Sequence, residues 1–454
     1  MKSFEKILQK IIPKNFFSFH ENVLTFQGLL SPKHPCLRIL YLIWSIPHNI
    51  FTTVYLISVE IIMAYQHYET NRTKAMVTIA VIFLHMVCSK RIFIWHFFLK
   101  KKYNRIINIL KRDVDFLIFN VNDVDLTLDK PPVGFSYECI KEYWQRKTRF
   151  YRKLDKYNRR NEIEDFKIRN DLHVKFQCLC IQLTFFMAVF LVIFNAYLIK
   201  QPRYYKFNPK LNVTSLYSGY PFETYFPFDT SITDGYYLMG QLYQIYMYIG
   251  CVETFLILDT SAWMYMWMLK GQLTTVRFAL RKLDCDIKVK GKKASLLIVE
   301  MRMIKCIEEV KFIIKGVQIL EQLYNVQLAI QYGMCVLIIC FTMYAVQLIT
   351  SVGELSYLFS ILVLILFEPL FISWISQSLT EEFYNVLSAL YELNWLDYPP
   401  PLRRKLLYFM MVLKKPKVLT LAGMLNIDFA FYLSLLKNSY SAYTLISKTQ
   451  EQGK

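Results

Sequence analysis

The sequence predicts an all-α membrane protein with seven transmembrane helices, its N-terminus in the cytoplasm and its C-terminus extracellular. Three observations support this fold class. The chain of 454 residues is 54% hydrophobic and 16% aromatic, which is too apolar for an ordinary soluble domain. It contains seven segments of roughly 20 or more mostly apolar residues, the length that crosses a bilayer. Its Lys and Arg residues crowd into every second connection between those segments.

The hydropathy pattern defines the spans. The first and the fourth are longer than a bilayer requires, so we expect them to tilt or to project from it. In chain order, the predicted spans are Leu37–Tyr65, Ala75–Phe98, Phe176–Ile199, Tyr236–Leu269, Leu323–Ile349, Leu355–Ile375 and Leu421–Ile446.

The charge distribution sets the orientation. The N-terminal tail and the second, fourth and sixth loops hold about 42 Lys and Arg residues, whereas the other loops and the C-terminal tail hold about 8. The basic set therefore belongs in the cytoplasm. The two glycosylation sequons, at Asn71 and Asn212, fall in loops assigned to the outside. Asn212 is the better acceptor because Asn71 lies close to a span.

Motifs exclude several function classes. The sequence has no phosphate-binding loop, no GxSxG or HExxH motif and no Cys/His spacing typical of a metal site, so it predicts no enzyme, no cofactor and no metal. No cysteine falls in an outside loop, so we expect no extracellular disulfide. The net charge of +19 follows the topology rather than a nucleic-acid surface, and part of it should meet anionic lipid head groups of the inner leaflet.

Four charged segments are expected to extend the helices into the cytoplasm. Tyr143–Lys175 should extend the third span, Thr274–Leu283 the fourth, and Leu296–Leu320 should lead into the fifth. Ser376–Trp395 should continue the sixth span until Pro399-Pro400-Pro401 breaks the helix. The pattern leaves open whether these extensions pack within one chain or form an interface between subunits.

These expectations divide the chain into four regions. They are a cytoplasmic amphipathic segment (1–36), helices one to six with their loops (37–375), a cytoplasmic anchor segment (376–420), and the seventh helix with a short extracellular tail (421–454).

Three carboxylates fall within predicted spans, where an ionisable group is expensive. Glu60 lies near the outer end of the first span and should reach water. Glu253 is in mid-helix and must face protein or a cavity. Glu368 precedes Pro369, which leaves a backbone carbonyl free. For Glu253 and Glu368, the pattern favours a structural polar contact over a role in an ion path.

The outer halves of helices two, three, four and six could enclose an apolar pocket for a small hydrophobic molecule. For any single residue, ordinary helix packing or lipid contact is the more frequent explanation. The candidate pocket residues, in chain order, are Met76, Ala80, Phe83, Met187, Phe190, Phe194, Tyr243, Met247, Tyr357 and Ser360.

The C-terminal stretch from Arg403 to Ile446 contains a basic residue with paired leucines, a short basic loop ending in Lys415-Pro416, a Leu-Thr-x-x-Gly turn and Lys437–Ser441 (KNSYS). This stretch resembles the signature of insect odorant receptors. The outer segment Tyr220–Asp229 is similar to that family's second extracellular loop. The match departs after the sixth span, where Trp374–Leu379 lacks the family's Cys-x-x-Gly-Asn run.

The resemblance implies a tetrameric, ligand-gated, non-selective cation channel in the plasma membrane of a sensory neuron dendrite. Its pore would be lined by the seventh helix, with Leu445 and Thr449 near the outer gate and Ser441 one turn deeper. Volatile organic ligands would bind in the outer pocket. The chain lacks the co-receptor's long insertion in the fourth loop, so it resembles a tuning subunit that assembles with the co-receptor or with itself.

Three other classes remain alternatives. A gustatory-receptor-like channel would end in a Thr-Tyr-…-Gln-Phe motif, which this chain lacks. A metabotropic seven-helix receptor would have the opposite orientation. A transporter would commonly show an inverted repeat, and none is visible.

Overall fold

The computed structural model describes ten ranges of the chain and six single residues outside them. The ranges are 35–50, 55–70, 100–110, 162–198, 204–208, 213–217, 234–283, 292–348, 352–421 and 423–452. The single residues are Ile12, Thr25, Ile79, Ile82, Phe226 and Phe228.

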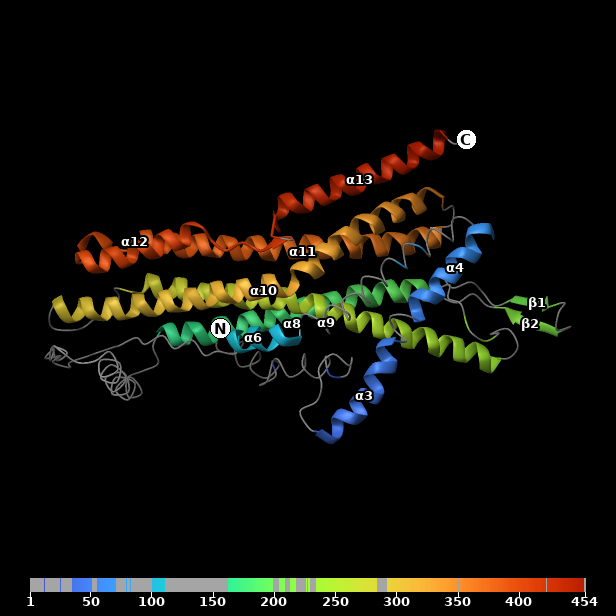
Figure 1. Ribbon diagram of the computed structural model, residues 1–454, viewed down its shortest axis with the longest axis horizontal. Coiled ribbons are helices and arrows are strands. Elements are labelled where there is room, and N and C mark those ends of the chain that lie inside the picture. Colours follow the sequence, from blue (N-terminus) through green and yellow to red (C-terminus); the bar gives the residue numbers. More distant parts are fainter. Residues whose placement is uncertain are drawn as a thin grey trace.

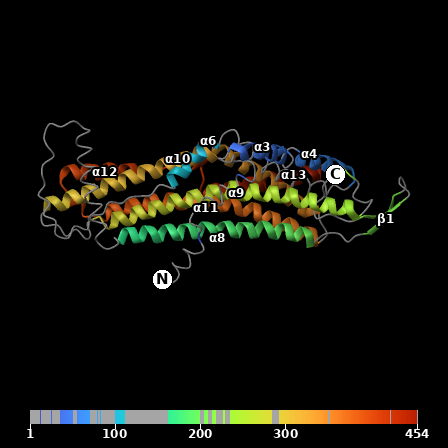
Figure 2. The same ribbon diagram turned by 90° about the horizontal axis from the view of Figure 1, so that it is seen from below.

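Long helices run side by side along the longest axis of the molecule (Figures 1 and 2). The helices α8 and α10 run in one direction, and α9 and α11 return in the other. The helices are α3 (Pro35–Ile50), α4 (Leu56–Thr70), α6 (Lys100–Leu110), α8 (Glu162–Leu198), α9 (Asp234–Arg281), α10 (Lys292–Leu348), α11 (Val352–Tyr391), α12 (Pro400–Lys414) and α13 (Phe429–Gln452), with a 3-10 turn at Trp395–Asp397.

Two small antiparallel hairpins complete the described part of the chain. The strands β1 (Tyr204–Asn208) and β2 (Val213–Tyr217) pair between α8 and α9, in a loop predicted to lie outside. The strands β3 (Thr420–Leu421) and β4 (Leu425–Asn426) pair just before α13.

The predicted helical extensions are confirmed where they are described. The helices α9, α10 and α11 each continue without a break through the expected end of the membrane span. The helix α8 begins at Glu162, and the earlier part of its predicted extension (143–161) lies outside the described residues. In the described residues, these extensions pack on one another within one chain.

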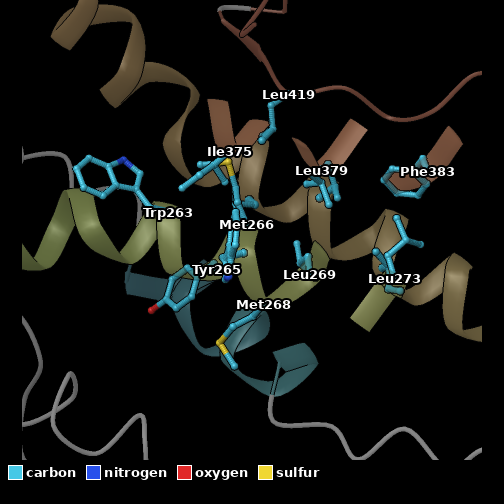
Figure 3. Close-up of a cluster of buried hydrophobic side chains, with 14 of the residues drawn as sticks. Trp263, Tyr265, Met266, Met268, Leu269, Leu273, Ile375, Leu379, Phe383 and Leu419 are labelled. Atoms are coloured by element: carbon cyan, nitrogen blue, oxygen red, sulfur yellow. The ribbon is translucent and has the colours of Figure 1, made fainter. Parts of the chain in front are cut away.

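The core forms where α9 meets α11. Met266, Leu269 and Leu273 of α9 lie against Ile375, Leu379 and Phe383 of α11, and all six side chains are buried. Figure 3 shows them as a continuous layer between the two helices. Burying side chains of this size contributes about 1.5–3 kcal/mol each, so this layer fixes the position of α11 relative to α9.

The short helix α6, which the sequence analysis did not predict, covers another side of the core. Its buried face comprises Tyr103, Ile106, Ile107 and Leu110, at helical spacing. The ring of Tyr103 lies 6.3 Å from that of Tyr265 on α9. This helical periodicity was not recognised in the sequence, because α6 begins with three lysines and lies in a highly charged loop.

The proline run begins a helix as well as following one. The helix α11 ends at Tyr391, and Pro400 and Pro401 occupy the first turn of α12. Proline suits this position because its missing N–H would have no partner in the first turn. The buried face of α12 consists of Leu402, Leu406, Phe409, Met410 and Leu413.

The first and the last predicted spans differ from the structure. The first contains two helices, α3 and α4, with residues 51–54 between them outside the described part. The last helix begins at Phe429 instead of Leu421, because the preceding residues form the β3–β4 hairpin. Gly423 adopts φ 72° in that turn, a conformation that glycine tolerates best.

Among the described residues, three helical segments are long and apolar enough to cross a membrane: Asp165–Asn195, Arg302–Gln347 and Leu358–Tyr391. Apart from Ile79 and Ile82, the second predicted span lies outside the described part. The count of seven spans and the orientation of the termini therefore stay predictions.

Candidate ligand pocket and pore helix

The helices α8, α9 and α11, three of the four expected to form the pocket, converge on a buried phenylalanine. Phe185 of α8 is 1% exposed, and its ring lies 4.7 Å from Trp263 of α9 and 6.1 Å from Phe367 of α11. Near the C-terminal end of α8, Asn195 donates a hydrogen bond to Ser356 at the start of α11 at 3.2 Å. The three helices are thus held together along the proposed outer half.

The candidate residues of α8 lie on a different face from Phe185. Met187, Phe190 and Phe194 are 48%, 49% and 48% exposed, and the rings of Phe190 and Phe194 stack at 6.1 Å. The described residues therefore leave this face half uncovered. The second-span candidates Met76, Ala80 and Phe83, which were expected opposite, lie outside the described part of the chain.

Tyr243 of α9 has aromatic neighbours from two other regions. Its ring lies 6.4 Å from Tyr55 beside α4 and 5.6 Å from Phe226 of the outer loop, both in edge-on geometry. Ser360 is partly buried on α11. Met247 and Tyr357 lie within α9 and α11, but their side chains are outside the described part. In the described residues, Tyr243 contacts the first span rather than the Phe190–Phe194 pair.

A polar contact between α3 and α9 was missed by sequence reasoning. The Nδ1 atom of His48 lies 2.6 Å from the hydroxyl of Tyr246, and Trp44 stacks on the imidazole at 5.2 Å. The sequence around a single histidine in an apolar helix does not show which residue its side chain will contact. The tyrosines at the start of α9 were visible in the sequence, but their pairing was not.

The intramembrane carboxylates are buried where they can be described. Glu60 is 2% exposed, so the expectation that it reaches water was wrong. It lies on the inward face of α4 rather than at an open end. Glu368 accepts a hydrogen bond from Gln331 of α10, in line with a structural polar contact. The side chain of Glu253 is outside the described part.

In the part of the chain that the structure describes, the last helix, α13, contacts the bundle mainly through one face. Phe431 packs on Tyr332 of α10, and Gln347 of α10 donates a hydrogen bond to the hydroxyl of Tyr443. The opposite face is exposed, including Ser441 and Leu445, which is 69% exposed. The backbone of Thr449 lies within α13, but its side chain is outside the described part.

The N-terminus of α13 is fixed by side-chain capping. The backbone N–H of Phe431 donates to Oδ1 of Asp428 at 2.8 Å, as in a helix N-cap. The backbone N–H of Phe429 lies 3.4 Å from Oε1 of Gln377 on α11. The sequence analysis did not identify Asp428 as a cap, because it placed the start of the last helix at Leu421.

Comparison with known proteins identifies the family. A family model described as 7tm Odorant receptor matches residues 141–440, well over half of the chain. The chain is 25% identical to Odorant receptor 42a of Drosophila melanogaster over 32% of its own length and 36% of the relative. It is 22% identical to Odorant receptor 10 of Aedes albopictus over 33% of its length and 40% of the relative. The matched segment spans less than half of each curated relative.

Solved structures show the same fold. The olfactory receptor OR5 from Machilis hrabei aligns with a TM-score of 0.62 at 15% identity, covering 95% of this chain and 97% of that one. The same receptor in complex with eugenol aligns with a TM-score of 0.59 at 14% identity, covering 98% and 99%. With the family match over residues 141–440, the chain belongs to the insect 7tm odorant receptor family, whose members are olfactory membrane receptors and not enzymes.

Proposed function

We propose that this odorant receptor is one subunit of a tetrameric, ligand-gated, non-selective cation channel whose pore is lined by α13. The observation that supports this most directly is the uncovered face of α13. When one face of a membrane helix packs on its own bundle and the other does not, something else must cover the second face. In a tetramer with a pore on its axis, the exposed face of α13 would contact the water of the pore and the α13 helices of the neighbouring subunits.

The composition of that face suits a pore. Leu433, Lys437, Ser441, Leu445 and Lys448 recur at three- and four-residue spacing and are all exposed. A stripe that mixes polar and apolar side chains is unsuited to lipid but can face water. Rings of leucines can close a narrow pore by dewetting, which assigns Leu445 to the gate. The two lysines do not favour cations, so selectivity would depend on other groups such as Asp428 or on the partner subunits.

The assembly interface is proposed at the far end of the bundle. Large apolar side chains of α11, the 3-10 turn and α12 are exposed there, beyond the expected membrane region. They are Tyr384, Tyr391, Leu396, Leu407, Tyr408 and Met411. Several large apolar side chains exposed to water at one end of a molecule favour an interaction site, and a symmetric oligomer would bury them. The partners are the co-receptor subunit or further copies of this chain.

The ligand would be a volatile organic molecule bound between the outer halves of the second span, α8, α9 and α11. The half-exposed side chains Met187, Phe190 and Phe194 would then face the second span, which carries Met76, Ala80 and Phe83. Tyr243, Met247, Tyr357 and Ser360 would complete the pocket from α9 and α11. The plasma membrane is the proposed location, with Asn212 glycosylated on the outside.

The test is whole-cell current during rapid application of a volatile panel, with this chain alone, the co-receptor alone and both together. Nucleotide-dependent G-protein signalling is blocked throughout, which separates a channel from a metabotropic receptor. We expect fast inward current that requires both chains. Current from this chain alone would indicate a homotetramer, and current that disappears with the G-protein block would reject the channel proposal.

Two substitutions locate the gate and the pocket. Leu445→Ala should raise the current in the absence of ligand, whereas Leu433→Ala, three turns deeper, should not. Phe194→Ala should change the ligand profile, whereas Phe359→Leu, on an exposed face of α11, should leave it unchanged. An unchanged basal current in Leu445→Ala receptors with normal surface expression would reject the gate assignment.

A further inference from the structure

A cluster of two tryptophans and a lysine joins α8, α9 and α11 near the middle of the molecule. The indole N–H of Trp267 donates to Oε1 of Gln177 at 2.8 Å. The ammonium of Lys270 donates to Oγ of Ser378 at 2.5 Å and lies 4.3 Å from the centre of the Trp267 ring. The rings of Trp267 and Trp374 are 5.3 Å apart. We call Trp267, Lys270 and Trp374 the Trp–Lys cluster.

The cluster lies where the surface of α11 changes from apolar to polar. Along one stripe of α11, the exposed residues Phe359, Val363 and Phe367 precede Trp374. The partly buried Ser378 and the exposed Glu381 follow it. Tryptophan and lysine gather at the membrane–water boundary, because each has an apolar body and a polar tip. By the charge distribution of the loops, this boundary is the cytoplasmic one.

An aromatic track leads from the cluster into the membrane region. Phe367 stacks on Phe371 at 5.6 Å, and Phe371 lies 5.4 Å from Trp374. Phe367 and Trp374 are 37% and 40% exposed, so the track is open to its surroundings at both ends. Its residues recur at four- and three-residue spacing on one side of α11. This surface is long, apolar and adjacent to a cation.

In the described residues, the ammonium of Lys270 donates its hydrogen bond to the hydroxyl of Ser378 rather than to a carboxylate. Neighbouring acids are engaged by other groups: Glu382 forms an ion pair with Arg277 at 3.0 Å, and Glu381 accepts from Gln377 at 2.9 Å. Partial burial lowers the pKa of Lys270, and Glu382 and Glu381 oppose that shift. A negative group placed beside Lys270 would likewise favour its charged form.

We propose that the Trp–Lys cluster binds the head group of an anionic phospholipid of the inner leaflet, with an acyl chain lying along the Phe367–Phe371–Trp374 track. Lys270 contacts the phosphate, and Ser378 and Gln177 supply further polar contacts. A soluble phosphate would gain nothing from the aromatic track, so the combination of cation and track selects a lipid. The site lies away from the outer ligand pocket and does not depend on the identity of the odorant.

Tryptophan fluorescence provides the test, because brominated acyl chains quench an indole that they touch. The full-length receptor is reconstituted into phosphatidylcholine vesicles containing about 20 mol% of either brominated phosphatidylserine or brominated phosphatidylcholine. We expect stronger quenching by the anionic lipid. Trp374→Phe should remove most of that excess, since it removes the exposed indole of the site.

Substitutions at the lysine test the head-group contact. Lys270→Gln should lower the preference for the anionic lipid about fivefold, the effect of one basic residue near a membrane surface. Lys270→Arg should retain it and serves as the test if the glutamine variant does not fold. Lys305→Gln is the matched control, because Lys305 pairs with Glu308 on α10, away from the cluster.

Three results would overturn the proposal. They are equal quenching by the two brominated lipids in the unsubstituted receptor, an undiminished preference in Lys270→Gln, and loss of the preference on adding soluble glycerophosphoserine. The last result would mean that the cluster binds a free anion. Raised ionic strength should weaken the preference in the unsubstituted receptor, because the head-group contact is electrostatic.

Discussion

Tyr332 of α10 packs edge-on against Phe431 at the start of α13, with ring centres 4.8 Å apart and planes at 89°. This pair ties the proposed pore helix to the longest helix of the bundle. Aromatic pairs in this geometry contribute about 0.5–1.5 kcal/mol beyond the area that they bury. A double-mutant cycle with Tyr332→Leu and Phe431→Leu should therefore give a coupling free energy in that range.

The coupling is measured from the free energy of unfolding in detergent. Tyr332→Phe is the control, because it keeps the ring pair and removes only the hydroxyl. Strictly additive effects of the two leucine substitutions would show that the ring contact does not hold α13 in place.

Gly271 is required where α8 crosses α9. A Cβ at this position would lie 2.6 Å from Cγ2 of Val174, and the short, branched side chain of valine has little freedom to move away. Gly271→Ala should destabilise the receptor by about 1–3 kcal/mol, measured as a fall in thermal stability by fluorescence-detected size exclusion.

Gly333→Ala is the matched control, since a Cβ at Gly333 meets nothing within 4 Å. It should be neutral or stabilise the helix slightly, because alanine is the better helix former. Adding Val174→Ala to Gly271→Ala should restore stability. A Gly271→Ala receptor as stable as the unsubstituted one would contradict the close packing.

Two arginines one turn apart on α9 should differ in their contribution to stability. Arg277 pairs with Glu382, whose side chain is 6% exposed, whereas Arg281 pairs with Glu392, whose side chain is 51% exposed. Arg277→Met leaves a buried carboxylate without its cation and should cost about 2 kcal/mol or more. Arg281→Met should cost about 1 kcal/mol or less.

Thermal stability at low and high salt distinguishes the two pairs. The smaller effect of Arg281→Met should shrink further at high salt, since the pair is exposed. Equal effects of the two substitutions would mean that the burial of Glu382 does not decide the strength of its pair.

The cap of α13 gives a fourth prediction. Asp428→Ala removes the acceptor for the N–H of Phe431 and should cost about 1 kcal/mol, measured by unfolding in detergent. Asp428→Asn should keep most of that stability, because asparagine caps nearly as well. The asparagine variant also separates capping from charge. If Asp428 contributes to cation selectivity, the reversal potential should shift in Asp428→Asn channels whose stability is unchanged.

The sequence predicted the long helices well because their apolar patterns extend over many turns. The helical continuation of α9, α10 and α11 beyond the expected spans was confirmed, and the family resemblance read from Arg403–Ile446 agrees with the match over residues 141–440. The start of α13 was misplaced because Leu419–Leu425 is apolar enough to read as helix. Gly423 and Asp428 mark the true start.

The candidate pocket was less predictable. Periodicity shows which residues share a face of a helix, but it does not show which face meets which neighbour. On α8, Met187, Phe190 and Phe194 form one apolar face, and Phe185 belongs to the face that packs on α9 and α11. Both faces are equally apolar, so hydropathy cannot choose between them. The pairing of His48 with Tyr246 depends on tertiary contact alone.

The unbroken course of α10 from the anchor to the outer end has a mechanical consequence. Its 57 residues make it about 85 Å long at 1.5 Å per residue. A rotation of about 3° around its middle would move each tip by about 2 Å. No loop interrupts α9, α10 or α11 along the way to absorb such a movement. In the proposed channel these helices would act as levers, and a small adjustment around a ligand at one end would become a displacement at the other.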